Sequence, residues 1–285
     1  MQISILEDLD DLDFSEKRIL ISLSGGINSA AVLAYVAKYV EQKPKMLFLY
    51  YSHLAEHSDD TFQFVMDCVK YANKHFDGVF FEYSMNSVND LFTSMNFIPH
   101  PRVPACTKVL KIVKILDFQR KHNIDLDLIG YVKGENRRIK RQIKNKALNK
   151  AYPISHLTDA DCFSLVEKEI GWYPAIYKIK WNDKRITPFL KCHKDTMPPE
   201  QYRIAMKYAS RGYGYGGSTA VFSHNNCLPC KNMQTYEYYL VKLFFPDKFE
   251  KAMKVANITG SHWGRSADSI AKAGQSASCS FCEFD

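Results

Sequence analysis

The sequence lacks the features that would place the protein in or across a membrane. No hydrophobic run reaches membrane-spanning length. Residues 1–16 are acidic and lack the basic-then-apolar order of a secretory signal. There is no internal repeat, and the nine histidines form no H-E-x-x-H or similar cluster, which argues against a hydrolytic zinc site. We therefore expect a globular protein of the cytoplasm with no membrane partner.

The composition is that of an ordinary globular protein. With 285 residues, 46% of them hydrophobic and 24% charged, the chain can bury one large core with an appendage or two smaller cores. The net charge of +7 permits an anionic ligand without requiring one. In a cytosolic protein, cysteines such as the eight present here are more often metal-binding, catalytic or buried than disulfide-bonded.

One short stretch near the amino terminus is the most informative part of the chain. An apolar β-type segment, 18–23, runs into Ser24-Gly25-Gly26-Ile27-Asn28-Ser29, and an alanine-rich helical pattern follows. A strand, a glycine turn and a helix together aim backbone N–H groups and a helix amino terminus at a phosphate. No Gly-Lys-Ser/Thr follows, so the stretch is not a Walker A motif. We predict a phosphate-binding turn, the alternative being an ordinary connection between a strand and a helix.

Hydrophobic patterning downstream alternates between strands and helices. Short apolar runs predict strands at 18–23, 46–51, 79–83 and 126–132, and helical spacing predicts helices at 30–37, 60–74, 88–95, 107–122 and 136–149. This alternation predicts an α/β fold with a doubly wound, mostly parallel sheet. Ligands of such sheets bind at the carboxyl ends of the strands, which is where the glycine turn falls.

The pattern changes beyond about residue 152. A helix is predicted to begin at Thr158, residues 211–218 are glycine-rich and irregular, and four of the eight cysteines lie in the last part of the chain. We therefore predict two domains. Residues 1–155 form the nucleotide-binding α/β domain, and residues 156–285 form a helical, cysteine-containing carboxyl-terminal part.

Three further motifs lie close to predicted strand ends. The segment 128–138 follows the fourth strand and opens a basic helix, the segment 105–111 opens the helix before that strand, and the segment 50–61 follows the second strand with an acidic, threonine-ended stretch. Lysine and arginine at such positions can neutralise a phosphate or a second anionic substrate.

Together these four motifs resemble those of the PP-loop ATP pyrophosphatases, in particular the phosphoadenosine-phosphosulfate reductase-like group. The glycine turn is similar to S-G-G-x-D-S, with Asn28 in place of the aspartate, and Cys106-Thr107-Lys108-Val109-Leu110-Lys111 is similar to a Cys-x-x-x-Leu-Lys segment. Segment 128–138 resembles G-x-R-x-x-E-S-x-R. In that segment Gly130, Glu135 and Arg138 match, and Val132 and Asn136 depart. The resemblance implies a HUP-like fold of the adenine-nucleotide α-hydrolase type.

The resemblance also implies roles for individual residues. The predicted nucleotide-binding residues are Ser24, Gly25, Gly26, Ile27, Asn28, Ser29, Tyr51, His53, Gly130 and Arg137. The predicted catalytic residues are Ser24, Asn28, Lys108, Lys111, Glu135 and Arg138. The implied cofactors are ATP and Mg²⁺. Since Asn28 cannot supply the carboxylate that Mg²⁺ prefers, Asp59, Asp60 or Glu135 must help, or the phosphates hold most of the metal.

Two C-x-x-C pairs stand far apart in the carboxyl-terminal part. This is the spacing with which two thiolates chelate one soft metal ion. We predict a Zn²⁺ ion or a [4Fe-4S] cluster bound by Cys227, Cys230, Cys279 and Cys282. The likeness to iron–sulfur sulfonucleotide reductases adds Cys106 as a reserve ligand. The alternative is a set of unrelated buried cysteines.

The segment Lys133–Lys150 contains eight lysines or arginines and one acid, Glu135. A solvated basic helix face is the plain interpretation. A track that meets the phosphates of a nucleic acid or a nucleotide is the alternative. Ile139, Ile143 and Leu148 give the same helix an apolar stripe for packing on a sheet.

The activity implied by the resemblance is ATP cleavage between the α and β phosphates to adenylate an acceptor. The reaction would be linked to sulfur transfer or to nucleotide or nucleic-acid modification, with a sulfur-donor protein and a homo-oligomer as partners. One alternative is a thiol- or iron–sulfur-dependent sulfonucleotide (PAPS/APS) reductase, although the tail 279–283 does not match the expected Glu-Cys-Gly-Leu-His-like context. Another is a non-catalytic adenine-nucleotide-binding sensor or subunit, an interpretation that Asn28 keeps open.

Overall fold

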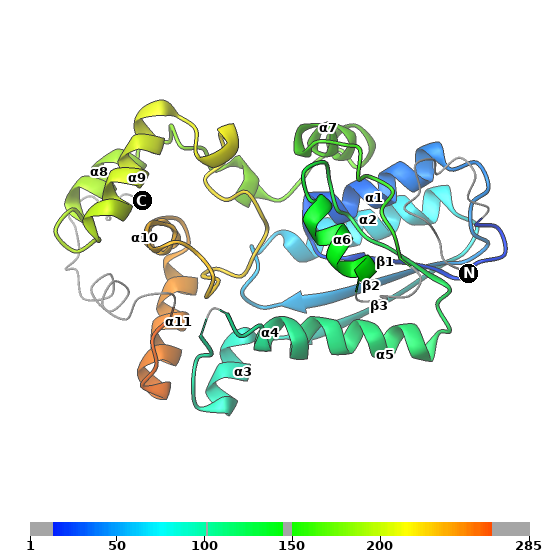
Figure 1. Ribbon diagram of the computed structural model, residues 1–285, viewed down its shortest axis with the longest axis horizontal. Coiled ribbons are helices and arrows are strands. Elements are labelled where there is room, and N and C mark those ends of the chain that lie inside the picture. Colours follow the sequence, from blue (N-terminus) through cyan, green and yellow to red (C-terminus); the bar gives the residue numbers. More distant parts are fainter. Residues whose placement is uncertain (1–13, 101, 145–149, 264–285) are drawn as a thin grey trace. The chain divides into compact units, whose positions relative to one another are not determined.

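The computed structural model describes residues 14–100, 102–144 and 150–263, which form two compact units (Figure 1). The first unit takes the chain up to His53, then Asp59–Met85 and Val109–Pro174. The second takes Leu54–Ser58, Asn86–Lys108 and the chain from Ala175 onward. The units therefore follow a different division from the predicted one at residue 155. The reason is that two segments leaving the sheet pack with the later helices.

A five-stranded sheet forms the centre of the first unit. Its strand order is β3-β2-β1-β4-β5, with bounds β1 Ile19–Leu23, β2 Leu47–Leu54, β3 Val79–Asn86, β4 Leu126–Leu128 and β5 Lys150–Ala151. The pairs β1–β2, β1–β4 and β4–β5 are parallel. This confirms the predicted doubly wound, mostly parallel sheet. The chain reverses its direction of winding between β1 and β4, where such sheets open a crevice for ligands.

Helices cover both faces of this sheet. Figure 1 shows α1 (Ile27–Tyr39) and α2 (Thr61–His75) on one face and α5 (Val113–Lys121) on the other. On the α5 face, one buried cluster contains Leu20 of β1, Phe48 and Tyr50 of β2, and Phe118 of α5. Phe48 and Tyr50 are two positions apart and therefore point to the same face of the sheet. On the other face, α7 (Asp159–Glu169) packs against α1, and Lys38 pairs with Glu169 at 3.0 Å.

The second unit is helical, as the sequence predicts for the carboxyl-terminal part. Its helices are α3 Val88–Met95, α4 Ala105–Thr107, α8 Ile186–Cys192, α9 Pro199–Arg211, α10 Thr235–Phe244 and α11 Pro246–Thr259, with short 3₁₀ turns η3 at Ala175–Lys178 and η4 at Tyr215–Gly217. Helix α11 packs against α3 and α10. The Phe92 ring on α3 lies 5.4 Å from the Trp263 ring, which is almost fully buried. No helix within the described ranges is both long and apolar enough to cross a membrane.

Several predicted elements differ from those observed. The strand predicted at 126–132 ends at Leu128, and residues 129–135 form a loop. The helix predicted at 107–122 consists of α4, the π-helical turn η2 (Lys108–Ile112) and α5. The helix predicted at 136–149 is α6, Asn136–Lys144, and residues 145–149 lie outside the described residues. Local hydrophobic spacing does not distinguish an α-helix from a π turn, because both bury one face.

Candidate functional site

The glycine turn lies directly between β1 and α1, at the predicted edge of the sheet. Gly25 has φ +75°, a conformation that glycine adopts without the steric cost of a Cβ atom. Gly26 is extended and immediately precedes α1. The chain therefore reverses over two residues and presents the first turn of α1 at the carboxyl end of β1.

Hydrogen bonds between Ser24 and Ser29 hold this turn closed. The Ser29 hydroxyl donates to the Gly26 carbonyl at 3.0 Å and accepts from the Ser24 N–H at 3.0 Å. Because that proton is engaged, the Ser24 hydroxyl is the donor in the 2.9 Å bond between the two hydroxyls. Gly26 N–H in turn donates to Ser24 Oγ at 3.2 Å. The loop is thus pre-organised by its own side chains, while Ser24 stays exposed to solvent.

The amino terminus of α1 is suited to an anion. Its first turn contains no acidic residue, and no side chain caps it. The aligned peptide dipoles place partial positive charge at this end of the helix. A phosphate here would meet both the dipole and the serine hydroxyls.

Gly130 brings the second motif into contact with the first. A Cβ atom at position 130 would lie 2.8 Å from the Asn28 carbonyl oxygen and 2.9 Å from the Asn28 carbonyl carbon. No real side chain tolerates such distances, so only glycine lets the loop after β4 approach the first turn of α1 this closely. The two motifs, about one hundred residues apart in sequence, therefore form one site.

The loop after β4 also fixes a guanidinium group. Glu135 accepts a hydrogen bond from Val132 N–H at 3.2 Å and forms an ion pair with Arg138. The Arg138 guanidinium lies 4.5 Å from the centre of the Tyr131 ring, and that ring stacks on Tyr152 at 5.5 Å. The two tyrosines are functional candidates that the sequence prediction missed. Tyr131 follows Gly130 directly, and that position was the signal available in the sequence.

Tyr51 and His53 lie at the carboxyl end of β2, as predicted. Tyr51 is opposite Leu23, the last residue of β1, and is fully buried. Its hydroxyl lies 3.1 Å from His53 Nδ1. The His53 ring meets Phe62 edge-on at 5.4 Å. This aromatic group borders the strand that carries the glycine turn.

Lys108 and Lys111 both lie on the π turn η2. The Ser52 hydroxyl of β2 donates to the Leu110 carbonyl at 2.5 Å, which ties η2 to the end of β2 that carries Tyr51 and His53. Lys111 is half-buried. Lys108 belongs to the second unit, and its relation to the glycine turn stays a prediction.

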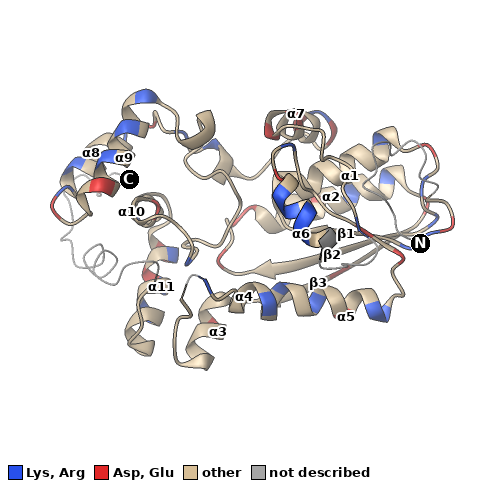
Figure 2. Ribbon diagram, viewed as in Figure 1, with Lys and Arg blue, Asp and Glu red and all other residues tan. Residues whose placement is uncertain are grey.

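The basic helix α6 follows the same loop. Figure 2 shows lysine and arginine positions, in blue, along its ribbon, and Ile139 is buried, as predicted for a helix that packs on the sheet. Arg137 is exposed at the start of α6. Ile143 and Leu148, the other members of the predicted stripe, have side chains outside the described set.

The predicted metal site is only partly within the described residues. Cys279 and Cys282 lie outside them. The turn of Cys227 and Cys230 is held by a 2.8 Å bond from Leu228 N–H to the Glu56 carbonyl and by a 2.8 Å bond from the Tyr238 hydroxyl to the Cys230 carbonyl. Across residues 14–263, gaps excepted, no three His, Cys, Asp or Glu side chains gather as a metal site.

Lys231 lies beside this turn and is buried. Its ammonium donates to the His100 carbonyl at 3.1 Å. Burial lowers the pKa of Lys231, and negative charge on Cys106 or Cys230, when either is a thiolate, opposes this effect. The structure therefore brings Cys106, the predicted reserve ligand, into the neighbourhood of Cys230. Both residues lie in the second unit.

Glu56 is another residue to which the sequence prediction gave no role. Its buried carboxylate accepts hydrogen bonds from the Ser87 hydroxyl and from the N–H groups of Val88 and Asn89, at 2.8 to 3.1 Å. The Glu56 carboxylate therefore caps the amino terminus of α3, and the backbone carbonyl of Glu56 accepts the hydrogen bond from Leu228 N–H. Within the acidic segment 50–61, this carboxylate is structural.

Comparison with known proteins finds no matching protein-family model and no matching curated sequence. Several solved structures are similar. The U34-tRNA thiolase NcsA from Methanococcus maripaludis, solved with its [4Fe-4S] cluster, has 13% identity and a TM-score of 0.40 over 73% of this chain and 74% of that chain. The NMN synthetase from Francisella tularensis has 13% identity and a TM-score of 0.35 over 71% and 80%.

The NH3-dependent NAD synthetase from Campylobacter jejuni, in complex with the nitrate ion, has 15% identity and a TM-score of 0.37 over 69% of this chain and 86% of that chain. These three proteins are members of the PP-loop ATP pyrophosphatase superfamily that the sequence motifs resemble. All the TM-scores lie below 0.5, so the assignment of the site depends on this chain's own motifs and contacts.

Proposed function

We propose that this chain is a PP-loop enzyme that binds ATP and cleaves it between the α and β phosphates, adenylating an acceptor. The observation that carries the proposal is the contact between Gly130 and Asn28, which joins the glycine turn to the loop that holds Arg138. A phosphate-binding turn and a fixed cation on neighbouring strands are what cleavage of a phosphoanhydride requires.

The glycine turn would bind the pyrophosphate portion of ATP. Backbone N–H groups from Gly25 to Ser29 and the Ser24 hydroxyl are the donors at the amino terminus of α1. The Ser24 hydroxyl can rotate from Ser29 to a phosphate oxygen without moving the backbone. The adenosine would lie toward the end of β2, where the half-buried His53 ring offers aromatic surface and the buried Tyr51 ring supports it from behind.

Charge on the α-phosphate would be stabilised by Arg138, Arg137 and Lys111. Arg138 is held by Glu135 and by the Tyr131 ring, so little side-chain entropy is lost when a phosphate binds. Glu135 acts here as a positioning residue for Arg138. Lys108 is the further cation of the proposed catalytic set.

Mg²⁺ would accompany ATP and supply further charge neutralisation. Nucleotide-bound Mg²⁺ usually takes one or two protein ligands and several phosphate oxygens. Asn28 together with Asp59 or Asp60 would supply the one or two protein ligands, and phosphate oxygens would supply the rest.

The thiols define a second, separable part of the proposal. Cys227 and Cys230 would bind a Zn²⁺ ion or a [4Fe-4S] cluster together with Cys279 and Cys282, with Cys106 as the reserve ligand. The described part supplies two of these four thiols on a fixed turn. Metal analysis after anaerobic purification should show one ion or cluster per chain and a loss of metal in Cys227→Ser. Cys162→Ser is the control, because burial raises the pKa of that thiol to about 12 and keeps it protonated.

Product analysis tests the ATP chemistry. ATP labelled at the α-phosphate should yield AMP or an adenylated species when acceptors such as tRNA or a small-molecule carboxylate are supplied. ADP as the main product would contradict the proposal. Tight binding without turnover would indicate the sensor alternative, and release of adenosine 3′,5′-bisphosphate from a sulfonucleotide would indicate a reductase.

Two substitutions sharpen this experiment. Asn28→Asp restores the carboxylate of the family motif and should increase AMP formation at low Mg²⁺, whereas the exposed Asn96→Asp should not. Arg138→Lys removes the planar group that stacks on Tyr131 and should lower the rate at least about tenfold. Its matched control is Arg120→Lys, because Arg120 forms the same i,i+3 ion pair, with Asp117, on α5.

A further inference from the structure

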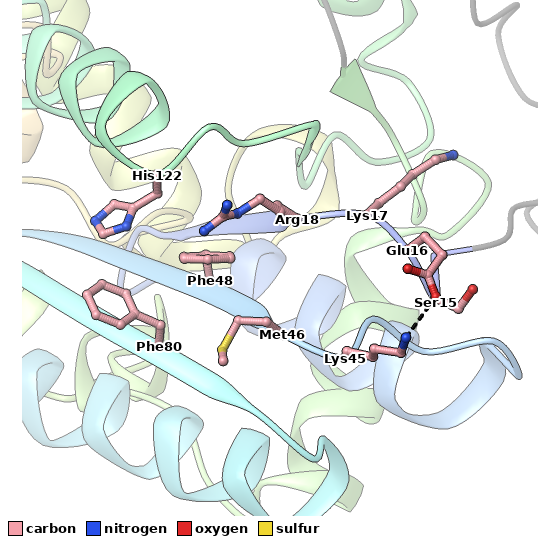
Figure 3. Close-up of a pocket in the computed structure, with 9 residues that line it drawn as sticks. All are labelled: Ser15, Glu16, Lys17, Arg18, Lys45, Met46, Phe48, Phe80 and His122. Carbon is pink, nitrogen blue, oxygen red and sulfur yellow. Dashed lines mark hydrogen bonds and ion pairs between the residues drawn. The ribbon is translucent and has the colours of Figure 1, made fainter.

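Figure 3 shows a cavity of the first unit, which has a volume of about 440 Å³. It lies at the opposite end of the sheet from the glycine turn, because Arg18 and Met46 precede β1 and β2. It opens where β1, β2 and β3 begin, so the five residues of β1 separate it from Ser24 by about 17 Å. The residues that line it, labelled in Figure 3, all belong to the first unit.

The inner surface of this cavity is aromatic. The buried Phe48 ring lies 5.7 Å from Phe80 and 5.5 Å from His122, and those two rings lie 4.7 Å apart. Phe80 is 38% exposed and Met46 is 42% exposed. Apolar side chains of this size usually lose more of their surface to packing, so a flat apolar group has room and contact area here.

The rim of the cavity carries an excess of positive charge. The Arg18 guanidinium lies 5.3 Å from the centre of the Phe48 ring, and among the described residues no carboxylate pairs with it. Lys45 is neutralised by Glu16 at 2.8 Å, and Lys17 adds a further cation. A guanidinium over an aromatic ring binds a carboxylate through two parallel hydrogen bonds at its outer edge.

We propose that this cavity binds an aromatic carboxylate, with its ring against Phe80, Phe48 and His122 and its carboxylate on Arg18. The volume suits a molecule of one or two fused rings. The apolar wall selects a flat ring, and the Arg18 guanidinium, which no carboxylate of the described residues neutralises, selects a single negative charge. The site is separate from the one proposed for ATP, since the two lie at opposite ends of β1.

Titration with 2-naphthoate, followed by ligand-observed NMR and calorimetry on the full chain, tests this proposal. We expect binding at one site per chain, with binding about tenfold weaker for 2-naphthalenemethanol, which lacks the charge, and for cyclohexanecarboxylate, which lacks the flat ring. Arg18→Gln should weaken 2-naphthoate binding about tenfold and leave the thermal unfolding temperature unchanged, because the exposed side chain is replaced while the Arg18 N–H still donates to Asp125.

Arg120→Gln is the matched control, because it removes an exposed arginine of α5 that does not line the cavity. The proposal is overturned by any of four results. These are no binding of 2-naphthoate, equal binding of either analogue, equal weakening by Arg18→Gln and Arg120→Gln, and displacement of 2-naphthoate by ATP. The last result would assign the ligand to the ATP site, whereas a failure of ATP binding alone would leave this proposal standing.

Discussion

At the scale of single residues, Gly130 shows how one missing side chain joins two motifs. Replacement by alanine would put a methyl group 2.8 Å from the Asn28 carbonyl oxygen, and the first turn of α1 would have to move. We expect Gly130→Ala to weaken ATP binding at least about tenfold in calorimetry, because the turn loses its pre-organised geometry. Gly260→Asn is the control, since it lies in open space at φ +58°, a conformation that asparagine tolerates. Unchanged ATP affinity in a folded Gly130→Ala variant would show that the close approach of the two motifs is not needed for ATP binding.

Asp127 is a buried carboxylic acid in the middle of β4. Burial raises its pKa to about 7, against the opposing effects of Lys150, its neighbour in register on β5, and of a 3.0 Å bond from Gln119. Since the folded state then holds a proton that the unfolded state releases near pH 4, the free energy of unfolding should fall as pH rises from 4 to 7, by roughly 4 kcal/mol at most, and then level off.

Asp127→Asn should abolish this slope and make the protein more stable at pH 8, as measured by urea unfolding at pH 5 and pH 8. Asp67→Asn serves as the opposite case. The hydrogen bond from Lys70, together with those from Gln63 and Trp172, lowers the pKa of Asp67, so its contribution is lost as the pH falls instead. A parallel change in both variants would show that Asp127 is not the group that titrates.

At the scale of elements, α7 begins where the sequence predicts. The Thr158 hydroxyl accepts from Asp161 N–H at 3.2 Å, and Asp161 accepts from Thr158 N–H at 2.8 Å, which is a reciprocal capping box. Thr158→Ala should lower the free energy of unfolding by about 1 kcal/mol and the Tm by about 2–4 °C. Thr93→Ala, at an exposed position within α3, should leave the Tm nearly unchanged. An equal loss in both variants would contradict a capping role for Thr158.

Two features of the elements around the site could not be predicted from the spacing of apolar residues. The strand predicted at 46–51 extends to Leu54, which puts Ser52 inside β2 and lets its hydroxyl hold the π turn η2. The helix that the spacing predicts across 107–122 contains that π turn where Lys108 and Lys111 lie. Both features depend on contacts between elements, and neither appears in the spacing of apolar residues.

At the scale of the whole molecule, helix α6 uses two of its faces for contacts within the chain. Ile139 turns one face inward, and Arg138 lies against Tyr131 and Glu135 at the site. We therefore expect tRNA and duplex DNA to bind weakly at physiological salt, and Lys140→Gln with Arg141→Gln to leave ATP affinity unchanged. Gel-shift titrations at two salt concentrations measure this. A tight complex with a steep salt dependence would assign α6 to a polynucleotide.

The sequence by itself determined the features that depend on neighbouring residues. The glycine turn, the alternation of strands and helices, the mostly parallel sheet and the start of α7 all follow from local spacing and local hydrogen bonding. Because the carboxyl ends of parallel strands share one edge, the sequence also placed the turn at the correct end of the sheet.

The tertiary structure alone decided which distant residues meet. It puts Gly130 against Asn28, stacks Tyr131 on Tyr152, and moves 54–58 and 86–108 into the unit of the later helices. It also places the exposed Arg18 guanidinium above Phe48 at the far end of the sheet. These contacts join residues tens to more than one hundred positions apart or depend on solvent exposure. Chain folding in three dimensions sets both, and the order of residues along a local segment does not contain them.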